Sequence, residues 1–127
     1  MFGEKSIYGQ SVVQTDNKSR ITIPSFTFAT KGDELVLLKE NDYYIILPAK
    51  IIDDYLDNLY EIINKSLDKN EINRIKNIII EISENILCKS TLDSNHRFNT
   101  YGNLENNQKF QVIGAKKQIF LKNILTL

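Results

Sequence analysis

Hydrophobic and polar residues alternate in short runs along the first third of the chain, a pattern typical of β-strands. Four runs lie at residues 11–15, 20–23, 34–38 and 43–47, and the first two are enriched in β-branched residues. The polar segment 16–19 favours a turn, and Pro24 and Pro48 each end a run because proline cannot donate to a strand ladder. The second pair of runs is almost continuously apolar, so we expect both its strands to be buried on two faces.

The period of the pattern changes at Ala49. Apolar residues then recur every three or four positions, as on one face of an amphipathic helix, at Ile52, Tyr55, Leu56, Leu59, Ile63 and Leu67. Asp68 followed by Glu71 resembles a capping box that opens a second helix, and isoleucines continue the spacing to Ile82. The sequence therefore predicts a helical hairpin, whose apolar stripe is more typical of packing than of a ligand groove.

One ten-residue pattern occurs twice, at residues 15–24 and, in altered form, at residues 92–101. In each copy an Asp opens a polar turn and an Arg closes it four residues later. The two pairs are Asp16 with Arg20 and Asp93 with Arg97. Such self-similarity constrains the architecture, but two copies are too few for a solenoid. We expect two like units around a pseudo-two-fold axis, with their turns on the same side.

These patterns together predict an α+β fold in a single domain of 127 residues. We expect a first repeat at residues 1–48, a helical hairpin at 49–85 and a degenerate second repeat at 86–127. Strands of the second repeat are expected near residues 87–92, 97–100, 110–113 and 118–122.

Composition narrows the class of protein. No apolar run approaches the ~20 residues that span a bilayer, and residues 1–10 lack the apolar core of a signal peptide. The single cysteine excludes an intrachain disulfide, which favours the cytoplasm. The net charge of zero argues against indiscriminate coating of nucleic acid. The charge is uneven, with five basic and eight acidic residues at 51–90 but five basic and two acidic at 91–127.

Residues suited to catalysis or metal binding are scarce. The only histidine, His96, and the only cysteine, Cys88, cannot by themselves form a zinc site, which takes three or four ligands. The carboxylates Asp53, Asp54 and Asp57 fall near a predicted helix start, where they oppose the helix dipole. The five glycines form no phosphate-binding loop. We therefore predict that the protein is not an enzyme and uses no metal or cofactor.

The basic turns are the remaining candidate site. Lys18 and Arg20 lie in and after the first turn, and Arg97 closes the second. The planar guanidinium group of arginine makes bidentate hydrogen bonds with phosphate and with guanine, so two such turns could follow a DNA backbone or enter the major groove. Alternatively, Arg20 and Arg97 serve only to close the turns by pairing with Asp16 and Asp93. The residues alone leave both readings open.

Residues 16–24, Asp-Asn-Lys-Ser-Arg-Ile-Thr-Ile-Pro, resemble the D-x-K-G-R-I-x-I-P signature of the AbrB-type (SpoVT-AbrB) swapped-hairpin DNA-binding domains. The layout of two such units around a helical pair is similar to the MraZ family of bacterial transcriptional regulators. Further similarity lies in Phe2-Gly3-Glu4, Tyr8, residues 44–48 and Val112-Ile113-Gly114. The resemblance covers nearly the whole chain.

The resemblance implies a pseudo-dimeric, β-barrel-like body and ring-like homo-oligomers in the cytoplasm at the nucleoid. Such oligomers would regulate transcription by binding repeated DNA boxes upstream of division and cell-wall genes. By motif match, Lys18 and Arg20 would contact DNA, Arg97 would be their weaker counterpart, and Asp16 and Asp93 would hold the turns.

The sequence also departs from the family pattern. Ser19 and His96 replace the family glycine, which has a positive φ, Asn95 replaces the lysine, and residues 98–101 lack the I-x-I-P. We therefore expect the second repeat to be mainly scaffold. Two rival hypotheses are an AbrB-like antitoxin that autoregulates, disfavoured by the apolar chain end, and a degenerate oligomeric scaffold that has lost DNA binding.

Overall fold

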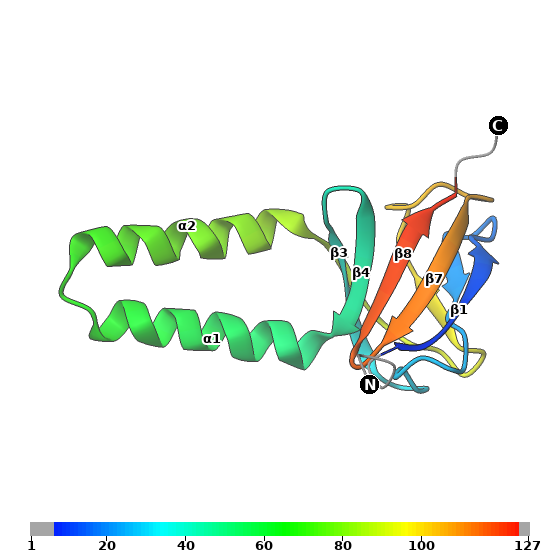
Figure 1. Cartoon of the computed structure of the whole chain (residues 1–127), viewed down its shortest axis with the longest axis horizontal. Helices are drawn as coiled ribbons and strands as arrows, with labels where there is room; N and C mark the ends of the chain where they lie inside the picture. Colours follow the sequence, from blue (N-terminus) through cyan, green and yellow to red (C-terminus); the bar gives the residue numbers. More distant parts are fainter. Residues whose placement is uncertain (1–6, 125–127) are drawn as a thin grey trace.

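The computed structural model describes residues 7–124 and is an α+β fold with a helical hairpin projecting from a β body (Figure 1). The strands of the first half are β1 (Ile7–Gln14), β2 (Arg20–Thr22), β3 (Glu34–Lys39) and β4 (Tyr43–Pro48). The helices are α1 (Ala49–Lys65) and α2 (Lys69–Asn85). The strands of the second half are β5 (Ile86–Thr91), β6 (Arg97–Asn99), β7 (Lys109–Ala115) and β8 (Gln118–Asn123). Phe2, Gly3 and Glu4, which carry part of the resemblance, lie outside the described residues.

Six antiparallel strands form the larger sheet, in the order β1-β7-β8-β4-β3-β5. If β1, β3 and β4 are matched with β5, β7 and β8, the strand order is the same when it is read from either edge of the sheet. In this arrangement the outer strand of each half pairs with the other half: Val13 of β1 faces Phe110 of β7, and Ser90 of β5 faces Leu35 of β3. The two halves are therefore interleaved, with β4 and β8 side by side at the centre.

The smaller sheet is a two-stranded ladder of β2 and β6, which we call the β2–β6 ribbon. Ile21 faces Phe98 at its centre, and neither side chain is exposed. Backbone bonds of 2.7 Å extend the ladder symmetrically, from Thr100 N to the Ser19 carbonyl and from Ile23 N to the His96 carbonyl. The pseudo-two-fold axis therefore passes between Ile21 and Phe98.

The main core draws on both sheets and both halves. Its buried residues are Ile21, Ile23, Ala29, Leu35, Leu37, Ile46, Leu92, Phe98, Leu104, Phe110, Val112, Ile119 and Leu121. On the other face of the larger sheet, a second cluster forms where the chain passes into α1, and it includes Val36, Leu47 and Ala49. Strands β3 and β4 thus have buried side chains on two faces, which confirms the prediction from their continuous apolar runs.

The expectation of a barrel-like body is wrong. The larger sheet is open, with β1 and β5 as its edges, and closure would require those two strands to pair. Instead β2 contacts β1 and β6 contacts β5, so the β2–β6 ribbon lies between the edges and contributes Ile21 and Phe98 to the core.

The helical hairpin has a small core of its own, formed by Leu59, Ile75 and Ile79. Asp68 caps α2 by accepting a hydrogen bond from Asn70 N at 2.9 Å. Two residues of the predicted packing stripe do not pack: Tyr55 is 48% exposed, and Leu67, in the connection between the helices, is 99% exposed. Within residues 7–124, neither helix combines the length and apolar character needed to span a membrane.

The buried position of Phe98 on the pseudo-two-fold axis allows a test of the fold. Replacing Phe98 by Ala removes a wholly buried ring from the main core, so we expect the free energy of unfolding in urea to fall by about 3–5 kcal/mol. Val12→Ala on β1 is the control, because Val12 is 62% exposed and its loss is expected to cost less than about 0.5 kcal/mol. Similar losses for the two variants would contradict the placement of Phe98.

Candidate nucleic-acid interface

The first turn, residues 16–20, is organised by one carboxylate. Oδ1 of Asp16 accepts hydrogen bonds from Lys18 N at 2.8 Å and from Arg20 N at 2.9 Å. The second oxygen, Oδ2, accepts a charged hydrogen bond from Nε of Arg20 at 2.8 Å. A backbone bond from Asp16 N to the Arg20 carbonyl closes the turn. The Asp side chain thus satisfies local backbone donors and holds the Arg side chain in place.

The second turn, residues 93–97, repeats this arrangement. Oδ1 of Asp93 accepts from Asn95 N at 2.9 Å and from Arg97 N at 2.8 Å, while Oδ2 accepts from Nε of Arg97 at 3.1 Å. The two turns share only Asp and Arg in sequence, and those are the residues whose side chains make the bonds. The same geometry is therefore built twice from a minimal common pattern.

Ser19 and His96 both adopt the left-handed backbone conformation, each with φ of 61°. The conformation is unfavourable for residues with a Cβ, and each of these side chains is tied to the other half of the chain. The Ser19 hydroxyl donates to Oδ1 of Asn106 at 3.3 Å. Nδ1 of His96 lies 2.9 Å from the Ile23 carbonyl, which can only accept, so this nitrogen carries the proton. These contacts help both turns to do without glycine.

The arginines lie on the outer face of the β2–β6 ribbon. Since Ile21 and Phe98 point into the core, their neighbours on each strand point away from it. Arg20 faces Asn99 across the ribbon and Arg97 faces Thr22, which makes the two arginines diagonal neighbours with Cα atoms about 7–8 Å apart. The structure therefore brings Arg20 and Arg97 together, whereas the exposed Lys18 lies at one end, within the first turn.

Each arginine is partly neutralised but keeps free donors. Backbone N–H groups, chiefly that of Arg20, lower the pKa of Asp16, and the guanidinium group adds to the effect. Asp93 has its pKa lowered in the same way, chiefly by the backbone N–H of Arg97. Both carboxyl groups are therefore ionised at neutral pH. The Nη nitrogens of the two arginines make no hydrogen bond or ion pair within the described part of the chain, so they remain available to a ligand.

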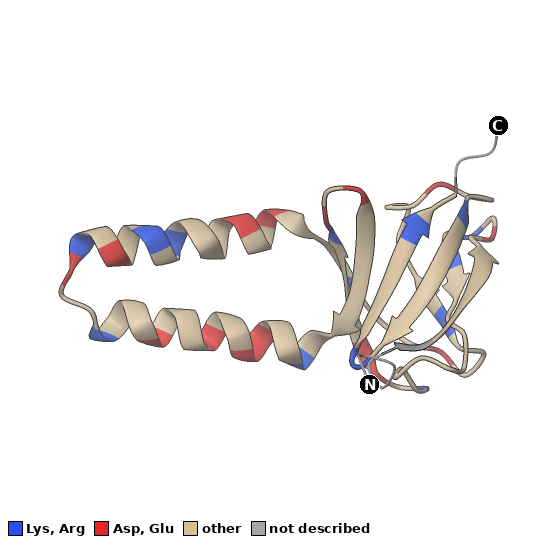
Figure 2. Ribbon diagram, in the orientation of Figure 1, with Lys and Arg blue, Asp and Glu red and all other residues tan. Residues whose placement is uncertain are grey.

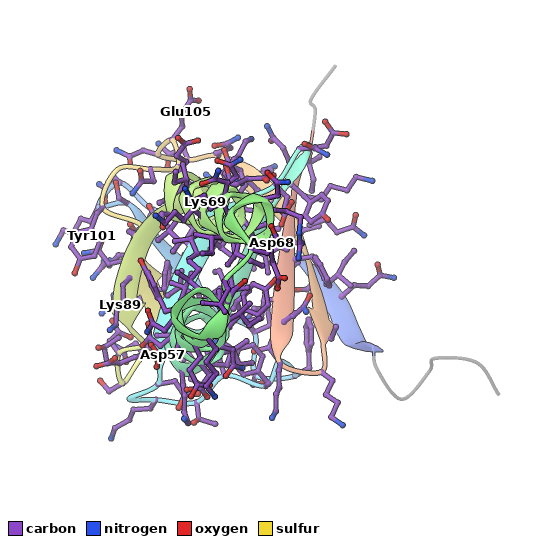
Figure 3. All side chains as sticks on the ribbon, turned by 90° about the vertical axis from the view of Figure 1, so that its left-hand side faces the viewer. Asp57, Asp68, Lys69, Lys89, Tyr101 and Glu105 are labelled. Atoms are coloured by element: carbon purple, nitrogen blue, oxygen red, sulfur yellow. The ribbon has the colours of Figure 1, made fainter. Side chains whose placement is uncertain are left out.

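Each turn also contacts a loop from the other half, which the sequence did not predict. Asn106 donates to the Asn17 carbonyl at the first turn, and Gly32 N donates to the Leu92 carbonyl beside the second. Glu105, whose carbonyl accepts a hydrogen bond from the Thr15 hydroxyl, lies near the first turn, and Lys31, next to Gly32, lies near the second. Glu105 projects outward (Figure 3). Figure 2 shows acidic residues along α1 between basic residues at its two ends, and both kinds of charge on α2 and on the β body. With Asp16 and Asp93 beside Arg20 and Arg97, the candidate interface has mixed charge. An alignment of the two loops with each other, as parts of the sequence repeat, could have revealed these contacts.

The residues considered for catalysis are dispersed. Cys88 Sγ lies 3.6 Å from the Thr100 carbonyl, whereas His96 contacts Ile23. Burial raises the pKa of the Cys88 thiol, which disfavours the reactive thiolate. Asp53 follows the first turn of α1, which contains no acidic residue, so the expected dipole interaction is weak there. Within residues 7–124, no three His, Cys, Asp or Glu side chains are grouped so as to hold a metal ion.

No protein-family model and no curated protein matches the chain.

The Asp-centred turns predict a pH-dependent contribution to stability. The pKa of each carboxyl is lower in the folded chain than in the unfolded one, so the turns stabilise the fold above the ordinary Asp pKa of about 3.9. This stabilisation is lost as pH falls through the lower folded values. We expect the Asp16→Asn/Asp93→Asn variant to be less stable than wild type at pH 6, with the difference shrinking below about pH 4.

Asn is a suitable replacement because its carbonyl oxygen can still accept the backbone hydrogen bonds, while its amide cannot accept from Arg Nε. The measurement is urea unfolding of both proteins at a series of pH values. Asp53→Asn/Asp57→Asn, at exposed positions on α1, is the matched control. A stability difference that stayed constant down to pH 2 would contradict an ionic role for Asp16 and Asp93.

Proposed function

We propose that the protein is a sequence-specific DNA-binding transcriptional regulator that acts as a homo-oligomer and contacts double-stranded DNA through the outer face of the β2–β6 ribbon. The observation that carries this proposal is the duplicated Asp–Arg turn, which directs Arg20 and Arg97 to one face of a two-stranded ribbon. A ribbon of this kind fits the major groove of B-DNA.

The ion pair with Asp favours recognition because it fixes the arginine before the ligand arrives. A free arginine side chain loses about 2 kcal/mol of rotamer freedom when it is ordered, and Asp16 and Asp93 restrict that freedom in advance. Nε is engaged by the carboxylate, while the Nη nitrogens can donate to guanine O6 and N7 or to phosphate. The structural and DNA-binding readings of these arginines are therefore compatible.

The finer assignment to the MraZ type rests on the resemblance, and two features support it. The interleaved strand order is what two swapped hairpins would produce, and the helical hairpin joins the two halves. On this proposal the DNA is a set of promoter boxes upstream of division and cell-wall genes, and the protein works at the nucleoid in the cytoplasm.

The mixed charge of the interface implies weak electrostatic attraction. Three basic groups of each copy, Lys18, Arg20 and Arg97, face the proposed ligand, so one copy neutralises at most three phosphates. The logarithm of affinity is therefore expected to fall with the logarithm of salt concentration at a slope no steeper than about −3 per copy. Specific affinity would then depend on several copies binding adjacent boxes, which raises the effective concentration of each turn.

An apolar surface on the helical hairpin favours the proposed self-association. Tyr60 and Ile80, 53% and 54% exposed, line a mainly apolar groove between α1 and α2 together with Ile63, Ile79 and Lys76. Covering this groove with another copy would remove apolar surface from water, which favours association.

A second candidate function is an oligomeric scaffold that does not bind DNA. The observation that favours it is the neutralisation of both arginines by Asp16 and Asp93, which leaves the turns with little net charge. Binding experiments distinguish it from the DNA-binding proposal.

Arg20→Ala tests the DNA-binding proposal. The substitution removes the Nη donors, whereas the backbone bonds to Asp16 can persist, so we expect an intact fold and loss of specific binding, by about five- to 150-fold or more. The measurement is fluorescence anisotropy with DNA from upstream of the gene, beside scrambled DNA, at low and moderate salt. Arg74→Ala on α2 is the control, since Arg74 is exposed on the hairpin.

Operator binding by Arg20→Ala as tight as that of wild type would refute the site assignment. Wild-type binding to operator no tighter than to scrambled DNA, at any salt concentration, would refute the regulator proposal and favour the scaffold.

Ile80→Glu tests the role of the hairpin in assembly. A carboxylate in the apolar groove would have to be desolvated in an interface, so we expect the mass measured by light scattering to fall towards that of the monomer. Leu67→Glu is the matched control because Leu67, 99% exposed, lies at the hairpin tip away from the groove. Unchanged mass for Ile80→Glu, or an equal loss for Leu67→Glu, would place the interface elsewhere.

A further inference from the structure

We propose that each protein copy reads a short, imperfect palindrome whose two unequal halves meet within a single major groove. Arg20 and Asn99, which face each other at one end of the ribbon, would read one half, and Arg97 and Thr22, at the other end, would read the other. The inference rests on the proposed DNA-binding function and extends it to the symmetry, spacing and reading residues of the DNA.

The symmetry argument begins with the β2–β6 ribbon. An axis perpendicular to the ribbon, between Ile21 and Phe98, exchanges Arg20 with Arg97 and Thr22 with Asn99. It also exchanges the two ladder-extending bonds, each 2.7 Å long. When a two-fold protein surface faces DNA, its axis aligns with a dyad of the duplex, and the recognised sequence is then palindromic to the degree that the protein is symmetric. A single chain thus supplies both half-site readers.

The spacing follows from the register. The Cα atoms of Arg20 and Arg97 are about 7–8 Å apart as diagonal neighbours. With about 3.4 Å per base pair, this distance corresponds to about two base-pair steps. A major groove is about 12 Å wide, so both arginines fit into one groove. We therefore expect abutting half-sites, in contrast to the spacing of about ten base pairs between half-sites of helix-turn-helix dimers.

The halves are unequal because the residues beside the arginines differ. The arginines favour guanine at symmetric positions. Thr22 is exposed, and it offers a hydroxyl and a methyl group that can contact the thymine methyl. Asn99 Oδ1 accepts from Tyr101 N at 2.8 Å, so Asn99 offers chiefly its amide donors to base acceptors. The residue equivalent to Tyr101 in the first half is Pro24, which has no N–H, so this restraint is absent there.

The two halves also differ in their expected contact with the phosphate backbone. Lys18 in the first turn has Asn95 as its counterpart in the second, so only the half read by Arg20 gains a lysine contact with the backbone. The half-site read by Arg20 and Asn99 is therefore expected to tolerate fewer mismatches, and each mismatch there should weaken binding by between about fivefold and 100-fold.

The test is selection of binding sequences from a randomised duplex library with the full chain. Wild type is expected to enrich an inverted repeat with abutting halves, symmetric guanines and unequal flanking bases. Asn99→Thr gives both halves the same reader and is expected to make the flanks alike. Thr22→Asn introduces an amide whose oxygen and nitrogen are both free to bind a base. We therefore expect adenine to become enriched in only one of the two flanks.

Thr22→Asn keeps the inference falsifiable if Asn99→Thr fails to fold without the bond to Tyr101. Thr91→Asn, at an exposed position of β5, is the matched control and should leave the enriched sequence unchanged. Enriched DNA without dyad symmetry, half-sites about ten base pairs apart, or a change in both flanks with Thr22→Asn would overturn this inference but leave DNA binding in place. If wild type enriched no sequence, the proposed function would fail together with the inference.

Discussion

The interface depends on hydrogen bonds to two carboxylates. In each turn, one Asp accepts from two backbone N–H groups and from the following Arg Nε, so the path of the backbone and the direction of the guanidinium group are set by the same side chain. The ribbon begins at the Arg in both turns. Its register, and therefore the distance between Arg20 and Arg97, follows from where the turns end.

An arginine that closes a turn is usually regarded as structural, and an arginine that binds a ligand as functional. In this protein the two roles would use different nitrogens of one group: Nε donates to the carboxylate, whereas the Nη atoms have no partner within the described residues 7–124. The cost is electrostatic, because each Asp offsets the attraction of its Arg for an anion. A surface of this kind is better suited to discriminating between sequences than to strong binding by a single copy, and assembly through the helical hairpin would compensate.

The sequence predicted the elements that depend on local interactions. The Asp–Arg spacing identified both turns because those two residues make the bonds, and the apolar runs of β3 and β4 reported their burial on two faces. Features set by long-range geometry were missed: the open sheet, the contact of Asn106 with the first turn, and the exposure of Leu67. Periodicity shows which face of a segment is apolar, but it does not show whether another segment covers that face.

The exchange of outer strands between the halves has a consequence for synthesis. Strand β1 pairs with β7, so the partner of Gln14 is Lys109, and a nascent chain must extend by almost a hundred residues before β1 has its neighbour. Until then, the N-terminal segment leaves the ribosome with an unpaired edge and an incomplete core. Pairings of such high sequence separation slow folding and prolong exposure to aggregation. The helical hairpin, whose contacts are local, can form during this interval and shorten the distance that β5 and β7 must search.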